Sequence, residues 1–580
     1  MVIAPMLAGA FFCDEASANP GITSEEQAAL YCAANGKTAA KNISALLDSV
    51  GPVQSPSGRY ELGYTLIVPI LRYFKKVDGA WMLDAQALRA NLATINDVDR
   101  PVIVHLSATH FVYAAEELSR ELALDPRNLM WTRNGPATPQ DNFNIPIVAW
   151  SLADQGSPMN VMRRQAFDAA VDALCALPAA SLKKIVGVSV LGETHDVFPD
   201  LLGGPDYSIP NSLLTDYSPV MKYGFRVWLA QRYTTIQRLN QDLAANFASF
   251  DAVSPPSRDI RSEVLDGYFD HIDNFAAGSV PVYGWLHDKA GRDLVIKILL
   301  DGIEIGAAEL GFNRTDVTEV LPDIADPNVG FRYNLDFRKL AYGLHTLDVQ
   351  VSANRGPALQ IAKRELVFID RNLSPWVRVP SIEVTAAPMS SDPSLIGGLD
   401  GPAGGQQSIF YNPLADLWLQ FRNLVVRNYI DQFARIASKS CIPTSKVFSH
   451  QIAPTLYGSW NSDVLAVEAS QHLSPSYTPG TTLYGGAAIG GAFLSMKQRL
   501  SWTRYAVNEM HTIVPLSAEA YAQMFDLHRN NGAVFVAPYY MQVPNRLPSG
   551  GDLNRFLIAP SNPRYGSNLY FNALRALMSK

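Results

Sequence analysis

Eight short apolar segments, each followed by a polar loop and an amphipathic stretch, constrain the fold of this chain most strongly. Their apolar and β-branched character is typical of parallel strands that helices cover on both faces. Repeated strand–helix units predict an α/β fold, and eight such units favour a (β/α)8 TIM barrel over an open sheet. The predicted strands are Tyr64–Leu71, Pro101–Leu106, Ile145–Trp150, Ile185–Leu191, Lys446–His450, Val464–Ala469, Trp502–Glu509 and Ala533–Tyr540.

Helix-capping signals agree with this pattern. Asn160 is a candidate N-cap, and Ser218 and Asn412 are each followed directly by a proline, which is favoured in the first turn of a helix. Amphipathic stretches that begin at these caps are predicted to be helices: 161–177, 220–250 and 414–436.

A segment with a different sequence pattern, roughly 280–370, interrupts the strand–helix repeat. Its short runs alternate apolar and polar residues between Gly-, Asp- and Asn-containing turns, which predicts an inserted small antiparallel β-sandwich. The predicted domains are 1–279 with barrel strands one to four, the inserted sandwich at 280–372, and 373–580 with strands five to eight. The strands expected in the sandwich are Leu294–Leu299, Ile303–Ala308, Phe331–Phe337, Gly343–Val351 and Glu365–Ile369.

Charge and composition argue against several classes of function. The chain has 580 residues and a net charge of −7, so nothing indicates a basic surface for nucleic acid. No apolar run reaches the roughly 18 residues that a membrane-spanning helix requires. Glycine motifs for nucleotides, the H-E-x-x-H and C-x-x-C metal motifs and the G-x-S-x-G elbow do not occur. We therefore expect no cofactor and no catalytic metal.

The first residues suggest export. Val2 to Phe12 is apolar and is followed by Ala16-Ser17-Ala18, which resembles the core and cleavage site of a signal peptide, although a basic start is missing. The alternative is that the segment belongs to the mature protein. Cys13 and Cys32 are close enough in sequence for a local disulfide or for two free thiols. We expect a secreted or periplasmic protein.

Two glutamates stand where catalytic residues of a TIM barrel are found, at the carboxyl ends of strands. Glu193 follows the fourth predicted strand, in "VGVSVLGETHDV", and Glu509 ends the seventh, in "RYAVNEMHTI". A retaining glycosidase requires one carboxylic acid and one carboxylate about 5–5.5 Å apart. Each glutamate alone is better explained as a structural ion-pair partner, but two on these strands favour catalysis.

The positions of these glutamates on strands four and seven resemble the arrangement of the clan A glycoside hydrolases. The segment Tyr223 to Ser257 also resembles the helix after strand four in family 42 β-galactosidases, with its F-x-x-W-L…Y-x-x-I-x-x-L-N pattern and Pro-rich loop. The resemblance implies that Glu193 is the general acid/base and Glu509 the nucleophile. The matching residues are Phe225, Trp228, Leu229, Tyr233, Ile236, Leu239, Asn240, Pro255 and Pro256.

One residue departs from the clan pattern. The clan has an asparagine before the acid/base, where it contacts the sugar 2-hydroxyl, and this chain has Gly192. A contact to the 2-hydroxyl strengthens in the transition state of such enzymes. Another side chain must therefore supply the contact, or the substrate carries a different 2-substituent.

Further polar and aromatic residues near predicted strand ends are candidate substrate contacts. Tryptophans can form the floor of a sugar subsite or belong to the core, and each histidine can equally be structural. Tyr477, placed after the predicted sixth strand, is the candidate for a hydrogen bond to the nucleophile, as the resemblance implies. The candidates are Trp150, His195, His450, Trp460, Tyr477, Asn508 and Tyr539.

These observations favour a retaining β-glycosidase that hydrolyses β-linked sugars of an oligosaccharide or polysaccharide by a two-glutamate double displacement. Two alternatives remain open. One is a carbohydrate-binding protein with an inactive barrel, because fold alone does not fix function. The other is a transglycosidase, which uses the same two carboxylates and a sugar hydroxyl in place of water.

Overall fold

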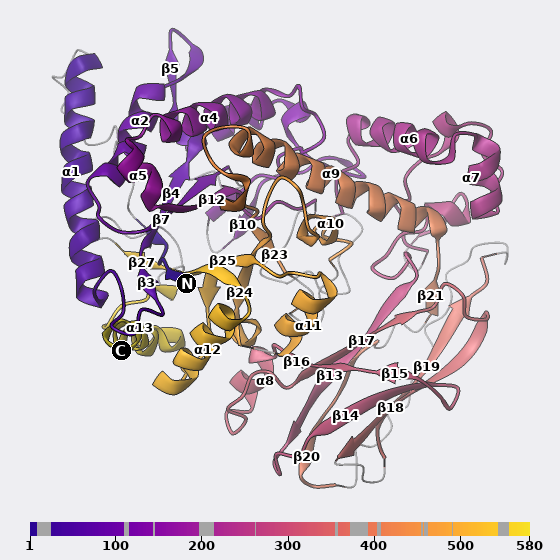
Figure 1. Ribbon diagram of the computed structural model, residues 1–580. Coiled ribbons are helices and arrows are strands. Elements are labelled where there is room, and N and C mark those ends of the chain that lie inside the picture. Colours follow the sequence, from indigo (N-terminus) through magenta and orange to yellow (C-terminus); the bar gives the residue numbers. More distant parts are fainter. Residues whose placement is uncertain are drawn as a thin grey trace.

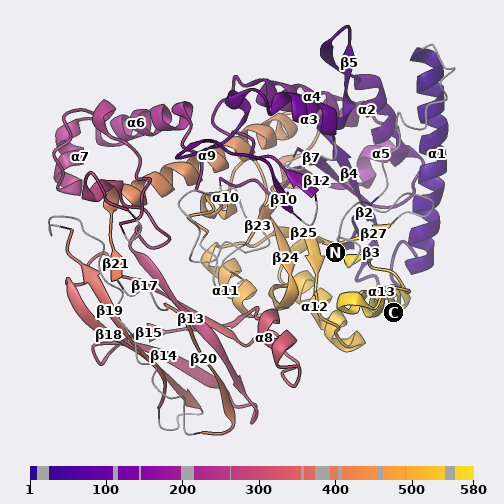
Figure 2. The ribbon, with the colours of Figure 1, turned by 180° about the vertical axis from the view of Figure 1, so that it is seen from behind.

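The computed structural model describes residues 1–8, 25–108, 115–142, 145–196, 214–260, 263–353, 358–371, 392–402, 408–453, 456, 462–489, 491–542 and 556–580. The predicted α/β class is confirmed, since parallel strands, surrounding helices and a separate group of antiparallel strands make up the molecule (Figure 1). The antiparallel strands lie at the opposite side of the molecule from helix α1 in both views (Figure 2).

Parallel strands form two sheets, with the orders β22-β12-β7-β4 and β23-β24-β25-β26-β1-β3. Single parallel bridges join them at both edges, between Met6, after β1, and Thr65 on β4, and between Phe448 on β22 and Thr478, before β24. The strands are β1 (Val2–Ile3), β3 (Glu61–Leu62), β4 (Tyr64–Pro69), β7 (Val102–Ser107), β12 (Ile185–Leu191), β22 (Val447–Phe448), β23 (Gln451–Ile452), β24 (Gly480–Tyr484), β25 (Tyr505–His511) and β26 (Ala533–Pro538).

Two predicted strands were wrong. Within Ile145–Trp150, β11 (Ile145–Ile147) pairs antiparallel with β10 (Gln140–Asn142), outside the parallel sheets. Val464–Ala469 is a turn that leads into α10 (Glu468–Gln471), and its apolar side chains pack in a cluster with helix α9. Strands β1 and β24 stand in the parallel sheets instead. The apolar run 464–467 is a buried loop, and the run 145–147 is a strand of a different sheet; periodicity alone separates neither from a strand of the parallel sheets.

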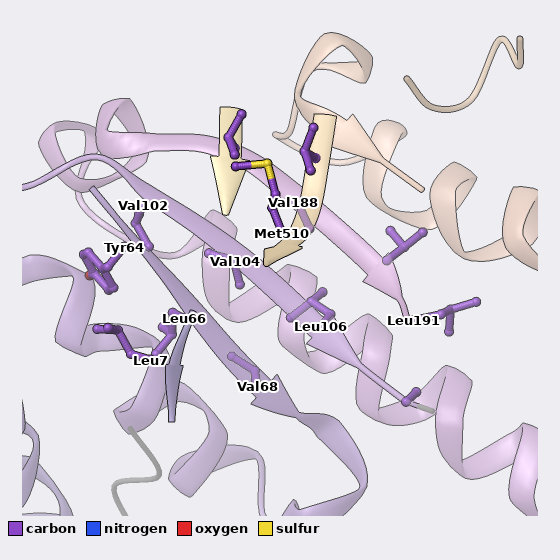
Figure 3. Packing of buried hydrophobic residues seen from close by; sticks show 14 of the residues in the cluster. Leu7, Tyr64, Leu66, Val68, Val102, Val104, Leu106, Val188, Leu191 and Met510 are labelled. Carbon is purple, nitrogen blue, oxygen red and sulfur yellow. The ribbon is translucent and has the colours of Figure 1, made fainter. Parts of the chain in front are cut away.

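Helices pack against the outer faces of the parallel strands (Figure 1). Val102 and Val104 on β7 belong to the main hydrophobic cluster with helix residues, whereas Ile103 between them belongs to a smaller cluster with Phe448 and Phe535. Both faces of the strands are therefore buried. Figure 3 shows residues of the main cluster on β4, β7 and β12, such as Leu66, Val104 and Val188. Helices with residues in this cluster include α1 (Glu25–Val50), α2 (Ala85–Leu92), α4 (Pro158–Cys175), α9 (Pro413–Ser438), α11 (Gly491–Arg499), α12 (Ala518–Asn530) and α13 (Ser567–Ser579).

Two of the three predicted N-caps are confirmed. Ser218 caps α6 (Pro219–Tyr233) by accepting a hydrogen bond from the Met221 amide, and Asn412 caps α9 in the same way. The cap of α4 is Ser157 and not Asn160, which lies inside the first turn. The predicted helix 220–250 is divided, because α6 ends at Tyr233 and α7 (Ile236–Leu243) begins two residues after Thr234, whose φ is +65°.

The antiparallel strands form two further sheets, β16-β17-β13-β20 and β15-β14-β18-β19-β21, in which β21 pairs parallel with β19. One hydrophobic cluster contains residues of both sheets, such as Val282, Ile298, Leu347 and Leu399. The strands are β13 (Ser279–Asp288), β14 (Leu294–Leu300), β15 (Ile303–Ala307), β16 (Glu309–Phe312), β17 (Gly330–Asp336), β18 (Gly343–Ala353), β19 (Leu359–Ile369), β20 (Leu395–Gly401) and β21 (Ser408–Phe410).

A disulfide between Cys175, at the end of α4, and Cys441, after α9, links segments 266 residues apart. The candidate bridge between Cys13 and Cys32 lies outside the described part of the chain, since neither side chain is described. Among the described residues, no helix combines the length and apolarity needed to cross a bilayer.

Candidate active site

The structure brings Glu193 and Glu509 together. Glu193 is the second residue after β12, and Glu509 is the fifth residue of β25, so both lie toward the carboxyl ends of parallel strands. One carboxyl oxygen of each glutamate and one ring nitrogen of His450, which follows β22, all lie within 4.8 Å of one another. The two glutamates are partly buried and the histidine is buried. Two carboxyl groups so close together form the centre of the candidate site.

Hydrogen bonds from neighbouring segments hold the loop that carries Glu193. The side-chain amide of Gln451 donates to the Thr194 carbonyl at 2.6 Å, and Arg422 on α9 donates to the Asp196 carbonyl at 2.5 Å. Arg422 is completely buried and also donates to the carbonyls of Thr215 and Val464. These bonds fix the backbone that follows Glu193 and so hold the position of its Cα.

Glu509 is oriented by two side chains. The Tyr484 hydroxyl, at the end of β24, donates a hydrogen bond to Glu509 Oε2 at 2.8 Å. His450 Nε2 lies 3.5 Å from the other oxygen, Oε1. Each carboxyl oxygen of Glu509 thus faces a different polar group, and the hydrogen bond from Tyr484 favours the ionised form of the carboxyl.

Burial raises the pKa of both carboxyl groups. Burial raises the pKa of Glu193, and the nearby Thr482 hydroxyl opposes this. Burial and the charge of Glu193 raise the pKa of Glu509, whereas the hydrogen bond from Tyr484 lowers it. Because two adjacent carboxylates are unfavourable in a buried site, the two shifts together favour retention of a proton by the pair.

Two buried histidines extend the site. His105 on β7 and His450 lie with ring centroids 4.7 Å apart, and His450 Nδ1 is 3.4 Å from His105 Nε2. Burial lowers the pKa of His105 to about 4, and burial together with His105 lowers the pKa of His450 well below its usual range. Both rings are therefore neutral at pH 7, and the contact between His450 and Glu509 is not an ion pair.

The backbone explains the glycine that departs from the clan pattern. Gly192 has φ +116°, and Leu191 before it has φ +66°. A side chain at position 192 would be strained at this φ, which L residues rarely adopt. The asparagine of the clan therefore does not fit this turn as it stands here. The buried Asn508, next to Glu509, donates to Ser189 Oγ at 2.7 Å, and its Oδ1 has no hydrogen-bond partner.

Two residues that were predicted to line the site, Tyr477 and Trp150, make other contacts. The Tyr477 hydroxyl donates to the Ser470 carbonyl at 2.8 Å, and the tyrosine that donates to Glu509 is Tyr484. Sequence reasoning missed Tyr484 because the strand was assigned to 464–469, although the β-branched run Thr-Thr-Leu after Pro-Gly was a usable strand signal. Trp150 is 2% exposed within the main core and forms a single bridge with Leu129, so it is a core aromatic.

The other predicted contacts have mixed outcomes. Tyr539, after β26, packs edge-on against Tyr484 with ring centroids 5.8 Å apart, so it adjoins the site. His195 is buried two residues beyond Glu193. Trp460 lies outside the described residues.

Within the part of the chain that the structure describes, two groups of side chains have the composition and spacing to hold a metal ion. One is the site itself, with Glu193, His450 and Glu509, and the other is Asp259, His271 and Asp273. In the second group, His271 Nδ1 accepts a hydrogen bond from the Ile260 amide, and Nε2 lies 3.3 Å from Asp273.

Comparison with known proteins gives only distant structural matches. No protein-family model matches the chain, and no curated protein matches its sequence. A β-galactosidase from the Antarctic haloarchaeon Halorubrum lacusprofundi aligns with a TM-score of 0.45 and 10% identity over 93% of this chain and 55% of that one. The catalytic domain of a β-amylase from Paenibacillus polymyxa aligns with a TM-score of 0.44 and 9% identity over 94% of this chain and 95% of that one.

A β-galactosidase from the psychrophilic Marinomonas ef1 gives a TM-score of 0.44 and 9% identity over 89% of this chain and 54% of that one. The chain thus spans about half the length of either β-galactosidase. Because likeness at these scores is weak, we base the function on the geometry of the site.

Proposed function

We propose that this protein is a retaining β-glycosidase that hydrolyses β-linked sugars of an oligosaccharide or polysaccharide. The observation that carries the proposal is the distance between the two glutamates, whose nearest carboxyl oxygens lie within 4.8 Å of each other. Retaining enzymes have carboxyl groups about 5–5.5 Å apart, whereas inverting enzymes need about 6.5–9.5 Å to admit a water molecule. The short separation supports direct attack by one carboxylate.

The surroundings of each glutamate support their separate roles. Glu509 receives the hydrogen bond from Tyr484, which suits a carboxylate that attacks the anomeric carbon. Glu193 then donates its proton to the leaving oxygen as the glycosyl–Glu509 ester forms. In the second step Glu193 removes a proton from water, the water oxygen bonds to the anomeric carbon, and Glu509 leaves as a carboxylate.

The proposal includes a (β/α)8 barrel as the scaffold. The two parallel sheets and the two parallel bridges between them support closure into a ring, with β1 as the first strand, β12 as the fourth and β25 as the seventh. The two sheets between Ser279 and Phe410, with their shared hydrophobic cluster, support an inserted sandwich domain. The Cys175–Cys441 disulfide supports a secreted or periplasmic location, because such bonds persist in oxidising compartments.

The test is a covalent trap. A panel of aryl 2-deoxy-2-fluoro-β-glycosides should leave one fluorosugar on the protein, detected as an added mass and located by peptide mapping on Glu509. Glu509→Gln should abolish hydrolysis of aryl β-glycosides. Glu193→Gln should slow it by about 10²–10⁴-fold for poor leaving groups, because it removes the general acid.

Glu519→Gln is the matched control, since Glu519 is exposed in the first turn of α12 and should keep full activity. The proposal is wrong if Glu509→Gln and Glu193→Gln both hydrolyse aryl β-glycosides as fast as the unmodified protein. Formation of a product with inverted anomeric configuration would also contradict the retaining mechanism.

A further inference from the structure

The site contains a third polar group that the two-step mechanism does not use. His450 is 2% exposed, and its Nε2 makes no hydrogen bond although it points at Glu509 Oε1 from 3.5 Å. A buried nitrogen without a hydrogen-bond partner is unfavourable, because it has lost its bonds to water and gained none in the protein. His450 Nε2 lies beside the carboxyl groups of Glu193 and Glu509. This combination favours a ligand that binds to a nitrogen atom and to carboxyl oxygens at the same time.

We propose that Glu193, Glu509 and His450 form a zinc-binding site, and that zinc reversibly blocks the two glutamates by occupying them. The inhibitory effect rests on the proposed function, whereas the binding itself does not. Zinc would take one oxygen from each glutamate and Nε2 from the histidine, and its fourth position would stay open to water.

The spacing of the three atoms fits a tetrahedral ion. Zinc–nitrogen and zinc–oxygen bonds of about 2.0–2.2 Å place neighbouring ligand atoms roughly 3.3–3.5 Å apart. The distance of 3.5 Å between His450 Nε2 and Glu509 Oε1 already matches this spacing of neighbouring ligand atoms. The three atoms all lie within 4.8 Å of one another, so the Glu193 carboxyl needs to approach by no more than about 1.3 Å to reach a spacing of about 3.5 Å. Glu193 follows the end of β12, where a side-chain rotation supplies that movement.

The neighbours of the three ligands support the same arrangement. Tyr484 holds Glu509 Oε2, which leaves Oε1 directed at His450. His105 contacts the Nδ1 side of the His450 ring at 3.4 Å, and such contacts fix the orientation of metal-binding histidines. Two facing carboxylates repel each other, and a divalent cation between them removes that repulsion.

The ligand set selects zinc over magnesium. An imidazole nitrogen with two carboxylates suits zinc, whereas magnesium prefers six oxygen ligands in a regular octahedron. Titration of the untagged, full-length protein with zinc chloride, followed by calorimetry, should therefore show binding that magnesium chloride at the same concentration does not reproduce.

Variants locate the binding site. His450→Gln and Glu509→Gln should each weaken zinc binding by at least about tenfold. Glu193→Gln is a second test from a different segment, in case His450→Gln does not fold. His472→Gln is the control, because His472 is half exposed and lies 3.8 Å from Glu468 in another part of the molecule. Zinc held by Asp259, His271 and Asp273 would persist in all four variants.

Activity separates this inference from the proposed function. Zinc should inhibit hydrolysis of an aryl β-glycoside competitively, and EDTA should restore the rate. Equal zinc binding by the unmodified protein and by the His450, Glu193 and Glu509 variants would overturn the zinc site and leave the glycosidase intact. Zinc that binds through these residues and activates hydrolysis would support the site and overturn the metal-free two-glutamate mechanism.

Discussion

The hydroxyl of Tyr484 controls how readily Glu509 carries a charge, because it donates its hydrogen bond to Oε2. Tyr484→Phe removes that bond and leaves burial and Glu193 to raise the pKa of Glu509 further. Since the nucleophile must be ionised, the acidic limb of the profile of kcat/KM against pH should move to higher pH. The loss of a hydrogen bond to a charged group, about 1.5–3 kcal/mol, corresponds to roughly a 10- to 100-fold lower kcat/KM.

Tyr477→Phe is the matched control for Tyr484→Phe, because the Tyr477 hydroxyl is bound to the Ser470 carbonyl. The profile of this control should coincide with that of the unmodified protein. An unchanged acidic limb in Tyr484→Phe would show that the bond does not set the charge of Glu509.

The sequence singled out Glu193 and Glu509 because each follows or ends an apolar, β-branched run that the structure also has as a strand. Tyr484 was missed because the more apolar run 464–469 was taken as the sixth strand, although the two β-branched threonines of β24 favour a strand. Trp150 was predicted to contact substrate but is buried in the core. The order of residues does not show whether an aromatic side chain at the end of an apolar run faces a cleft or the core.

The short helix η10 (Gly485–Ala488) connects Tyr484 to the antiparallel sheets. A Cβ at Gly486 would lie 2.2 Å from Asn328 Oδ1, and one at Gly485 would lie 2.4 Å from Asn313 Nδ2. These asparagines flank α8 (Thr315–Val320), between β16 and β17. No local pattern in the sequence predicts this contact, because it joins segments far apart in the chain.

Gly486→Ala should displace η10 and with it the Tyr484 hydroxyl. We expect kcat on aryl β-glycosides to fall by up to about 100-fold, since a shift of about 1 Å in a catalytic group has effects of that size. Asn328→Ala alone should have little effect on kcat, and the Gly486→Ala/Asn328→Ala double variant should recover most of the rate by removing the steric conflict. Equal rates for the single and double variants at position 486 would show that the close contact with Asn328 is not what moves η10.

In the sequence, the antiparallel sheets from β13 to β21 lie between the two glutamates, so the site exists only when the segments before and after these sheets stay together. Glu193 lies before the sheets and Glu509 after them. The Cys175–Cys441 disulfide links the same two segments, from the end of α4 to the residues that follow α9. Its loop encloses all the strands from β13 to β21, and cross-links across long loops restrict the unfolded chain most.

Replacing both cysteines, Cys175→Ser/Cys441→Ser, should therefore lower the stability of the body that carries both glutamates by about 2–4 kcal/mol. The measurement is the urea midpoint followed by tryptophan fluorescence, with catalytic activity recorded in parallel because the two transitions need not coincide in a chain of this size. Activity at low urea should stay near that of the unmodified protein, since neither cysteine touches the glutamates in the described structure. A midpoint unchanged by the double substitution would mean that packing between α4 and α9 alone keeps the two segments together.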